Sequence, residues 1–306
     1  MILCVTPNPA IDRTLHVGTL RLGEVHRSDS VLALAGGKGL NVARTIRALG
    51  GAPLCMGLLG GHTGNLLAEL AEREGLSAYW TRMKSETRTC VILVEEDKDA
   101  TVINERGTDV SADECQNFLR DVWAQAEHAQ LVCVSGSLPP GFLLDDFATL
   151  LQGLVARGKS VWVDTSGTAL KTALDARGMN IKVNAAELGE ALGLEISDAE
   201  QATNAGRQLL ERGISSVVVT LGKNGAIMVA EAGAWIARPP AIDVVSSVGS
   251  GDAFLGGLVF ALDAGNPPEV ALRYGVAAGA ANALHFGGGM VRSEEFDMFF
   301  DGAIVL

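Results

Sequence analysis

Short apolar runs alternate with amphipathic stretches along most of the 306-residue chain. The apolar runs have the length of strands and are expected at Ile2–Thr6, 54–58, Leu131–Ser135, Ser160–Asp164, 181–183 and Ser216–Thr220. Apolar residues at helical spacing predict helices over 41–49, 64–74, 145–156, 168–176, 187–192 and 200–212. Continuous apolar strands flanked by helices are typical of a parallel sheet covered on both faces. The pattern therefore predicts an α/β fold with three αβα layers around a mostly parallel central sheet.

Two β-rich stretches, approximately 12–34 and 77–105, interrupt this alternation. Polar and apolar residues alternate at 89–94 and 100–103, as in strands with one solvated face. We expect both stretches to leave the main sheet and to pair into a small β-sheet lid over one edge. The outer face of this lid could also form a subunit contact. Because no linker or internal repeat separates the segments, residues 1–306 are predicted to form a single domain.

Composition and charge exclude several classes of protein. The net charge is −12 and no Lys/Arg cluster is present, which argues against a nucleic-acid partner. The longest apolar runs are too short to span a membrane, and the start lacks a basic leader, so a cytoplasmic location is expected. The five cysteines form no CxxC pair and the five histidines show no metal-ligand spacing, so no zinc site is predicted.

The most informative passage is a glycine-rich turn that leads into an amphipathic stretch at 246–262. Gly249, Ser250 and Gly251 precede Asp252, and a helix is expected to begin near Gly251. The first N–H groups of a helix lack intrahelical partners and can bind an anion such as phosphate. Asp252 would then accept a proton from an attacking hydroxyl, and we expect it to be ionised at neutral pH. An ordinary loop with a helix-start aspartate explains this segment alone about equally well.

Further polar residues follow predicted strands or open helices near the start of the chain. Gly37, Lys38 and Asn41 lie in a turn that lacks the Walker A spacing but can place backbone, a cation and an amide against a polar ligand. Asp12 can accept hydrogen bonds from sugar hydroxyls, and Arg88 in the proposed lid can bind a phosphate bidentately. The alternative interpretation is that these residues are solvent-exposed loop residues that bind no ligand.

The second half of the chain contains candidates for a nucleotide site. Asn184 and Glu187 are three residues apart, and their oxygens suit Mg²⁺ bound partly through water. The segment 220–225 ends an apolar strand with a flexible turn that could contact a nucleotide. The small residues at 277–282 could leave room for an adenine ring, although close helix packing explains them equally well.

Three motifs occur in order along nearly the whole chain: Gly36-Gly37-Lys38-Gly39-x-Asn41, Asn184-x-x-Glu187 and Gly249-x-Gly251-Asp252. Together they resemble the ribokinase-like (phosphofructokinase B) family of carbohydrate kinases, which implies the ribokinase-like fold. The segments 6–12 and 135–141 are similar to the branch that acts on phosphorylated ketohexoses. That branch includes 1-phosphofructokinase, tagatose-6-phosphate kinase and a 6-phosphofructokinase. The segment 86–90 looks more like tagatose-6-phosphate kinases.

The resemblance implies roles for the matched positions. Asp252 would be the catalytic base beside an anion hole formed by Gly249, Ser250 and Gly251. The sugar phosphate would be held by Asp12, Gly37, Lys38, Asn41, Arg88 and Ser137. ATP would be held by Lys182, Asn184, Thr220, Gly222, Gly225, Gly279 and Asn282, and Mg²⁺ would be organised by Asn184 and Glu187. A monovalent cation would bind near 246–248, and a homodimer through the lid is expected by analogy with relatives.

The sequence therefore predicts an ATP-dependent kinase that phosphorylates a primary hydroxyl of a ketohexose phosphate. Two alternatives stay open. One is a kinase of an unphosphorylated sugar or nucleoside, and the other is a non-catalytic sugar-phosphate sensor on the same fold.

Overall fold

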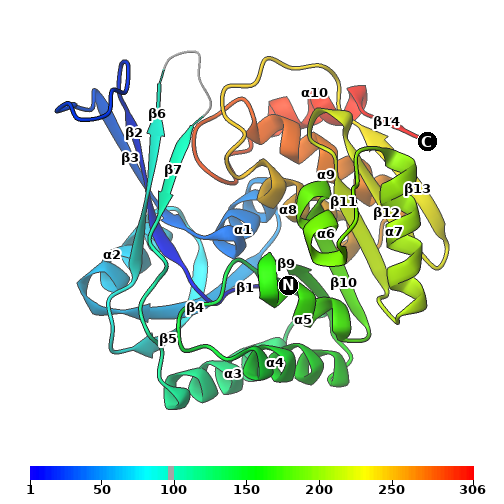
Figure 1. Cartoon of the computed structure of the whole chain (residues 1–306), viewed down its shortest axis with the longest axis horizontal. Coiled ribbons are helices and arrows are strands. Elements are labelled where there is room, and N and C mark those ends of the chain that lie inside the picture. The colour runs from blue at the N-terminus through cyan, green and yellow to red at the C-terminus, as the bar shows by residue number, and fades with distance from the viewer. Residues whose placement is uncertain (96–99) are drawn as a thin grey trace.

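The computed structural model describes residues 1–95 and 100–306. Its main sheet has ten strands (Figure 1). In spatial order they are β14 (Ile304–Val305), β13 (Gly233–Arg238), β12 (Ala226–Ala230), β11 (Ser216–Thr220), β10 (Met179–Asn184), β9 (Ser160–Asp164), β8 (Leu131–Ser135), β1 (Ile2–Thr6), β4 (Pro53–Gly60) and β5 (Ser77–Met83). Strands β11 to β5 in this order pair in parallel, and β12 to β14 add an antiparallel edge. The prediction of an α/β fold with a mostly parallel sheet is confirmed.

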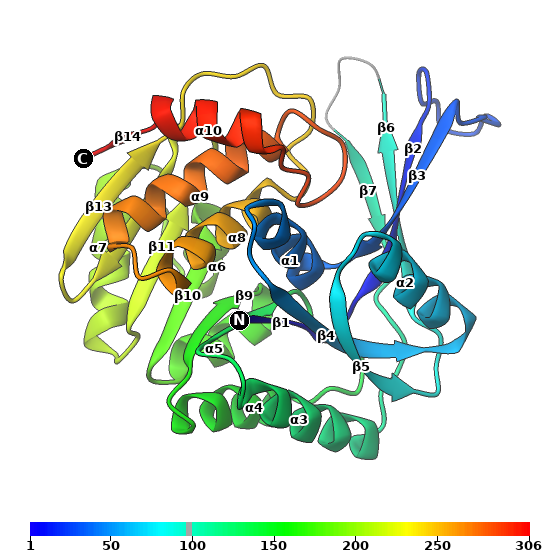
Figure 2. The same ribbon diagram turned by 180° about the vertical axis from the view of Figure 1, so that it is seen from behind.

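Helices cover both faces of this sheet, as the two opposite views show (Figures 1 and 2). One face carries α3 (Ala112–Ala126), α4 (Leu144–Ala156), α5 (Gly167–Asp175), α6 (Ala185–Leu192) and α7 (Ala199–Glu211). The other carries α1 (Lys38–Ala48), α2 (Gly61–Arg73), α8 (Ser250–Asp263) and α9 (Pro268–Asn282), with α10 (Ser293–Gly302) packed on α9. The central strand β1 serves both cores: Leu3 and Val5 face the first helix layer, and Ile2 and Cys4 face the second.

The lid is a separate four-stranded sheet in the order β3-β2-β6-β7. It consists of β2 (Ala10–His16), β3 (Ser30–Gly36), β6 (Arg88–Val94) and β7 (Thr101–Asn104), and Figure 1 shows it standing beside the main sheet. One of its faces turns toward the loop after α9, because His16 makes an edge-to-face contact with Phe286 at 4.5 Å. Residues 96–99 of the predicted lid segment lie outside the described residues.

The prediction placed 77–105 in the lid, but its first part belongs to the main sheet. Residues 77–83 form β5, which pairs in parallel with β4. The helix α2 is the crossover between these two strands, so β4, α2 and β5 form one βαβ unit. Only β6 and β7 continue into the lid.

No helix of the described residues is long and apolar enough to cross a bilayer.

Candidate functional site

A buried ionic cluster lies where β9 and β10 end beside the start of α1. The fully buried Asp164 accepts hydrogen bonds from the ammonium groups of Lys38, at 2.7 Å, and Lys182, at 2.8 Å. Lys182 is itself buried, whereas the Lys38 side chain is 35% exposed. A carboxylate at this depth is stable only when it is paired, and two cations pair with it here. Lys38 alone of the three can also reach a ligand from solvent.

Asp252 lies in the first turn of α8, next to this cluster. The N-cap Gly249 adopts the left-handed conformation with φ 76°, and a Cβ there would come within 2.3 Å of the Gly288 Cα. Among the described residues, no acceptor is bonded to the N–H of Gly251, so this amide can receive an anion at the positive end of the helix. A Cβ on Gly251 would lie 2.8 Å from Lys182 Nζ. The geometry thus supports the predicted anion hole beside Asp252.

The electrostatics of Asp252 differ from the simple expectation of a helix-start aspartate. Burial raises the pKa of Asp252, while Lys38, Lys182 and a hydrogen bond from Asn41 Nδ2 to Oδ2 at 2.8 Å oppose this rise. Burial likewise acts against ionisation of Asp164, but Lys182 and Lys38 outweigh it and lower the Asp164 pKa. Desolvation dominates at Asp252 because its carboxyl group, unlike that of Asp164, forms no ion pair with any of the described residues.

Asp12 of β2 faces the same region from the lid. Its carboxyl group fills the space beside Gly36, where a Cβ would come within 2.1 Å of Asp12 Cγ. Burial raises the pKa of Asp12 to about 6, with Arg44 and Arg88 opposing the rise and Asp252 adding to it. A carboxylate held in this way gains by hydrogen bonding to hydroxyl groups of a ligand.

A cavity of about 620 Å³ adjoins the cluster and is lined by Arg88, Arg106, Ser137 and the start of α5. Asn8 organises one wall of it. Its Nδ2 donates to Ser137 Oγ at 3.2 Å and to the Arg106 carbonyl at 3.0 Å, and its own carbonyl accepts from Arg88. Two arginines and a serine in one cavity suit a phosphorylated ligand. The structure thus brings Arg88 and Ser137, two of the predicted sugar-phosphate residues, to one cavity.

The candidate nucleotide residues lie along the next strand ends. Asn184 and Thr220 are register partners at the ends of β10 and β11. Asn184 and Glu187 form a reciprocal capping box, with Glu187 N donating to Asn184 Oδ1 at 2.8 Å and Asn184 N donating to Glu187 Oε2 at 3.0 Å. The motif therefore has a structural role at the start of α6. The other oxygen of Glu187 has no partner in the part of the chain that the structure describes, so water or a ligand can bind it.

Gly222 and Gly225 shape the turn after β11, where both have positive φ. At Gly225 a Cβ would come within 1.9 Å of the Ala237 carbonyl oxygen, so β13 requires glycine at this position. Gly222 is exposed and has open space around it. Of the two, Gly222 is therefore the position at which a ligand can approach the backbone.

Gly279 and Asn282 pack against residues 248–250 at the start of α8, the candidate anion-hole turn. A Cβ on Gly279 would lie 3.2 Å from the Ser250 carbonyl oxygen. Asn282 is fully buried; its Nδ2 donates to the Val248 carbonyl and Ser250 Oγ, and its Oδ1 accepts from Met290 N. Close packing accounts for both residues, and Asn282 joins the anion-hole turn to the loop after α9.

A metal ion would find few protein ligands here. Among the described residues, no group of three or more His, Cys, Asp or Glu side chains is placed to hold a metal. One free carboxylate oxygen of Glu187 fits Mg²⁺ that is bound mainly by phosphates and water.

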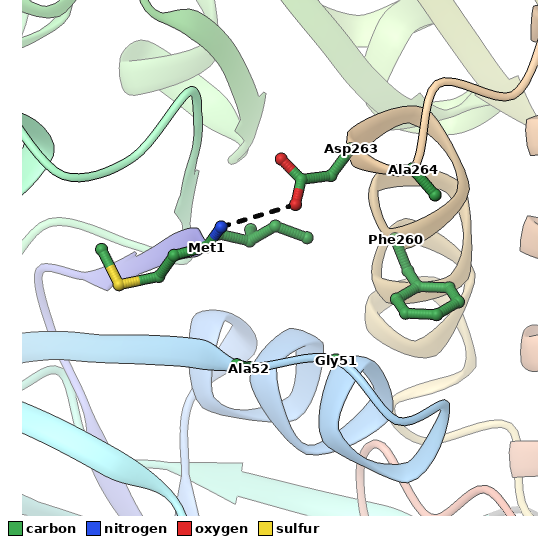
Figure 3. Close-up of a pocket in the computed structure, with 7 residues that line it drawn as sticks. Met1, Gly51, Ala52, Phe260, Asp263 and Ala264 are labelled. Carbon is green, nitrogen blue, oxygen red and sulfur yellow. Dashed lines mark ion pairs between the residues drawn. The ribbon is translucent and has the colours of Figure 1, made fainter.

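A second, smaller pocket lies at the opposite end of the strands (Figure 3). It holds about 130 Å³ between Met1, Gly51 and Phe260, and its ion pair joins the Met1 amino group to Asp263 at 3.7 Å. It contains none of the predicted site residues.

Sequence reasoning assigned no role to two residues of the site, Asp164 and Arg44. Asp164 follows the apolar run of β9 directly, and its position at a strand end was the available signal. The partners of Arg44 come from segments far from it in the chain, so no local pattern indicated a role for it.

Comparisons of the sequence and of the structure with known proteins find relatives of one kind, the pfkB carbohydrate kinases and phosphofructokinases. The profile of pfkB family carbohydrate kinases matches residues 6–294. A 1-phosphofructokinase of Bacillus subtilis is 31% identical over 93% of each chain, and one of Escherichia coli is 33% identical over 91% of this chain and 89% of that protein. Phosphofructokinase-2 from E. coli, solved with substrates and products, superposes with a TM-score of 0.89 at 27% identity over 98% of each chain. A Thermotoga maritima ribokinase shares the fold, with a TM-score of 0.77 at 20% identity over 98% of this chain and 99% of the ribokinase.

Proposed function

Because the chain belongs to the pfkB family of carbohydrate kinases, we propose that it transfers the γ-phosphoryl group of ATP to a primary hydroxyl of a ketohexose phosphate. The observation that carries this proposal is the buried Asp252 beside two lysines and the Gly251 amide, which has no hydrogen-bond acceptor within residues 1–95 and 100–306. The arginine-lined cavity next to this centre supports a phosphorylated acceptor. The 1-phosphofructokinase relatives support the same substrate class.

In the proposed reaction, the acceptor hydroxyl gives its proton to Asp252 while its oxygen attacks the γ-phosphorus. The bond between this phosphorus and the leaving oxygen of ADP breaks. The amides of Gly249 and Gly251 and the ammonium group of Lys38 stabilise negative charge on the transferring group, while the Ser250 amide donates to the Ser247 carbonyl and holds the turn. Asp12, Gly37 and Asn41 orient the sugar, and Arg88 and Ser137 hold its existing phosphate.

The nucleotide would lie along the ends of β10 and β11. Lys182, Asn184, Thr220, Gly222 and Gly225 would contact ATP, with Gly279 and Asn282 behind the anion hole. Mg²⁺ supplies charge neutralisation of the phosphates when bound, and Glu187 would hold its water shell. E. coli phosphofructokinase-2 has been solved with potassium, and we place a corresponding monovalent cation beside 246–248.

We also propose a homodimer through the outer face of the lid. Leu15, Val31, Val91, Leu93 and Ile103 share this face by strand register, on the side away from Phe286. Val31 is 50% and Ile103 57% exposed, and together with the neighbouring apolar residues they form an apolar face that a second copy can cover. E. coli phosphofructokinase-2 has an inhibited form that is tetrameric. A cytoplasmic location is part of this proposal.

The test is a substrate panel with Mg-ATP: fructose 1-phosphate, fructose 6-phosphate, tagatose 6-phosphate, fructose, ribose and adenosine. We expect turnover of at least one ketohexose phosphate with kcat/KM well above that of the unphosphorylated compounds. Asp252→Asn should lower kcat by roughly 10²–10⁴-fold without changing the fold, because the proton acceptor is lost. Preferred turnover of fructose, ribose or adenosine would instead support a kinase of unphosphorylated substrates. Ligand-induced melting shifts without turnover would support a sensor.

A further inference from the structure

The side chain of Arg44 connects four segments of the site. It is 11% exposed and comes from α1. Its Nε and Nη2 donate to Glu74 Oε2 at 2.9 and 2.6 Å, and Nη2 also donates to the Ala35 carbonyl at 2.6 Å. Its Nη1 donates to Asn41 Oδ1 at 2.8 Å and to the Gly288 carbonyl. A guanidinium group has five N–H donors, and all five are used here.

These contacts determine the orientation of the Asn41 amide. Arginine has no hydrogen-bond acceptor, so the end of the amide that faces Arg44 must be the oxygen. The Nδ2 group then faces Asp252 and donates to Oδ2. An amide N–H requires an acceptor, so Oδ2 is held unprotonated, and Oδ1 is the oxygen left for a substrate hydroxyl.

Building on the proposed function, we propose that Arg44 is a positioning residue for phosphoryl transfer. It fixes the Asn41 amide so that Asn41 holds one oxygen of Asp252 and leaves the other free for the acceptor hydroxyl.

The remaining contacts of Arg44 extend this role to the surroundings of Asp252. Ala35 belongs to β3 where the lid joins the main domain, and its N–H donates to Glu74 Oε1 at 2.8 Å. Gly288 packs against Gly249, the N-cap of α8. The same guanidinium group therefore fixes the base of the lid, the amide that orients Asp252 and the loop behind the anion hole.

The pH dependence of the reaction reports on this arrangement. The hydrogen bond from Asn41 lowers the pKa of Asp252, so its loss should raise that pKa. The charged groups that act on Asp252 are Lys38 of α1, Asp164 of β9, Lys182 of β10 and Asp12 of β2. Arg44→Lys leaves all four of these groups in the chain. Arg44 also lowers the pKa of Asp12, and lysine at position 44 keeps the positive charge that does so.

The experiment compares Arg44→Lys with Arg47→Lys, a matched change at an exposed arginine of the same helix. In Arg44→Lys we expect kcat to fall about 10- to 100-fold, because lysine cannot hold the amide in place. The KM for ATP should stay within about twofold, and the acidic limb of the kcat–pH profile should move to higher pH. The same pKa change should appear in carbon-13 NMR of labelled aspartate, where Asp252→Asn identifies the resonance. Arg47→Lys should match the wild type.

A lower melting temperature with an unchanged Asp252 pKa and acidic limb would overturn the proposal and leave Arg44 with a structural role only. Should Arg44→Lys not fold, Glu74→Gln decides, because it keeps Arg44 but weakens its main anchor; it should shift the Asp252 pKa in the same direction by less. Failure of the wild type on every sugar of the panel would overturn the proposed function instead. The NMR titration would still test Arg44 in that case.

Discussion

Asp164 illustrates how one residue can hold two cations in place inside the protein. Its carboxylate is fully buried between Lys38 and Lys182. Asp164→Asn would leave both ammonium groups without their anion, and breaking a buried pair typically costs about 3–5 kcal/mol. We expect a loss of that order in the free energy of unfolding, measured by urea titration at pH 7.

Asp175→Asn is the matched control, because Asp175 pairs with Arg212 at the same distance of 2.8 Å but is 74% exposed. Its loss should be below about 1 kcal/mol. Equal losses in the free energy of unfolding for the two variants would show that the buried ion pairs of Asp164 stabilise the protein no more than an exposed pair does.

Asp12 should make the free energy of unfolding fall as pH rises, whereas a salt-bridged carboxylate makes it rise. Its pKa is about 6 in the folded protein, above the value of about 3.9 for an unfolded aspartate. Between these values the folded state binds more protons, so stability falls as pH rises. Asp12→Asn should therefore be more stable than the wild type at pH 7, by at most about 3 kcal/mol, and should approach it at pH 4.

Urea titrations of the wild type and Asp12→Asn between pH 4 and pH 7 measure this difference in the free energy of unfolding. A difference that stays constant with pH would contradict the prediction.

At the scale of residues, sequence patterns identified the candidate ligand-binding residues but not the residues that hold them in position. Lys38, Asn41 and Asp252 were predicted together, and the structure brings them together. The partners that orient them, Asp164 and Arg44, were given no role, because a hydrogen bond between segments far apart in the chain leaves no local pattern. The same limit applies to the pKa of Asp252, since burial depends on the complete fold.

At the scale of elements, α8 offers a direct comparison between its two ends. Gly249 and Gly265 have nearly equal positive φ angles of 76° and 79°. A Cβ on Gly265 meets nothing within 4 Å, whereas one on Gly249 would come within 2.3 Å of Gly288. We expect Gly265→Ala to lower the free energy of unfolding by about 1–2 kcal/mol through backbone strain alone.

Gly249→Ala should lower the free energy of unfolding more than Gly265→Ala does. It should also reduce kcat about 100-fold, because the candidate anion-hole turn moves. Thermal melts and initial rates of both variants measure this. Similar behaviour of the two would mean that the contact with Gly288 does not shape the turn.

The elements themselves were predictable where a single pattern was sufficient. The buried parallel strands and helices α1, α2 and α4 to α7 follow directly from apolar runs and helical spacing. Strand β5 was assigned to the lid because the whole stretch 77–105 looks β-rich and no crossover helix of its own follows it. Only the pairing of β5 with β4 reveals that it belongs to the main sheet. Helices α3 and α10 and strands β12 to β14 were not predicted. The capping box of Ser111 and Glu114 at the start of α3 is a local signal that could have revealed that helix.

At the scale of the whole molecule, the proposed dimer can be tested on the outer face of the lid. Glutamate at both Val31 and Ile103 would place charges on a face that the partner covers. We expect sedimentation velocity to show a dimer for the wild type and a monomer for Val31→Glu/Ile103→Glu. Met298→Glu, at a 58% exposed position of α10, should remain dimeric. A monomeric wild type at micromolar concentration would contradict the proposed assembly.

The hydrogen bond between Asn41 and Asp252 spans 211 positions of the chain. A ribosome therefore releases the lysine-bearing turn long before the helix that carries the acid. Until α8 docks against α1 and β1, the nascent protein holds one half of its reaction centre and exposes apolar surface that α8 later covers. An incomplete chain without α8 therefore lacks the acid that phosphoryl transfer requires.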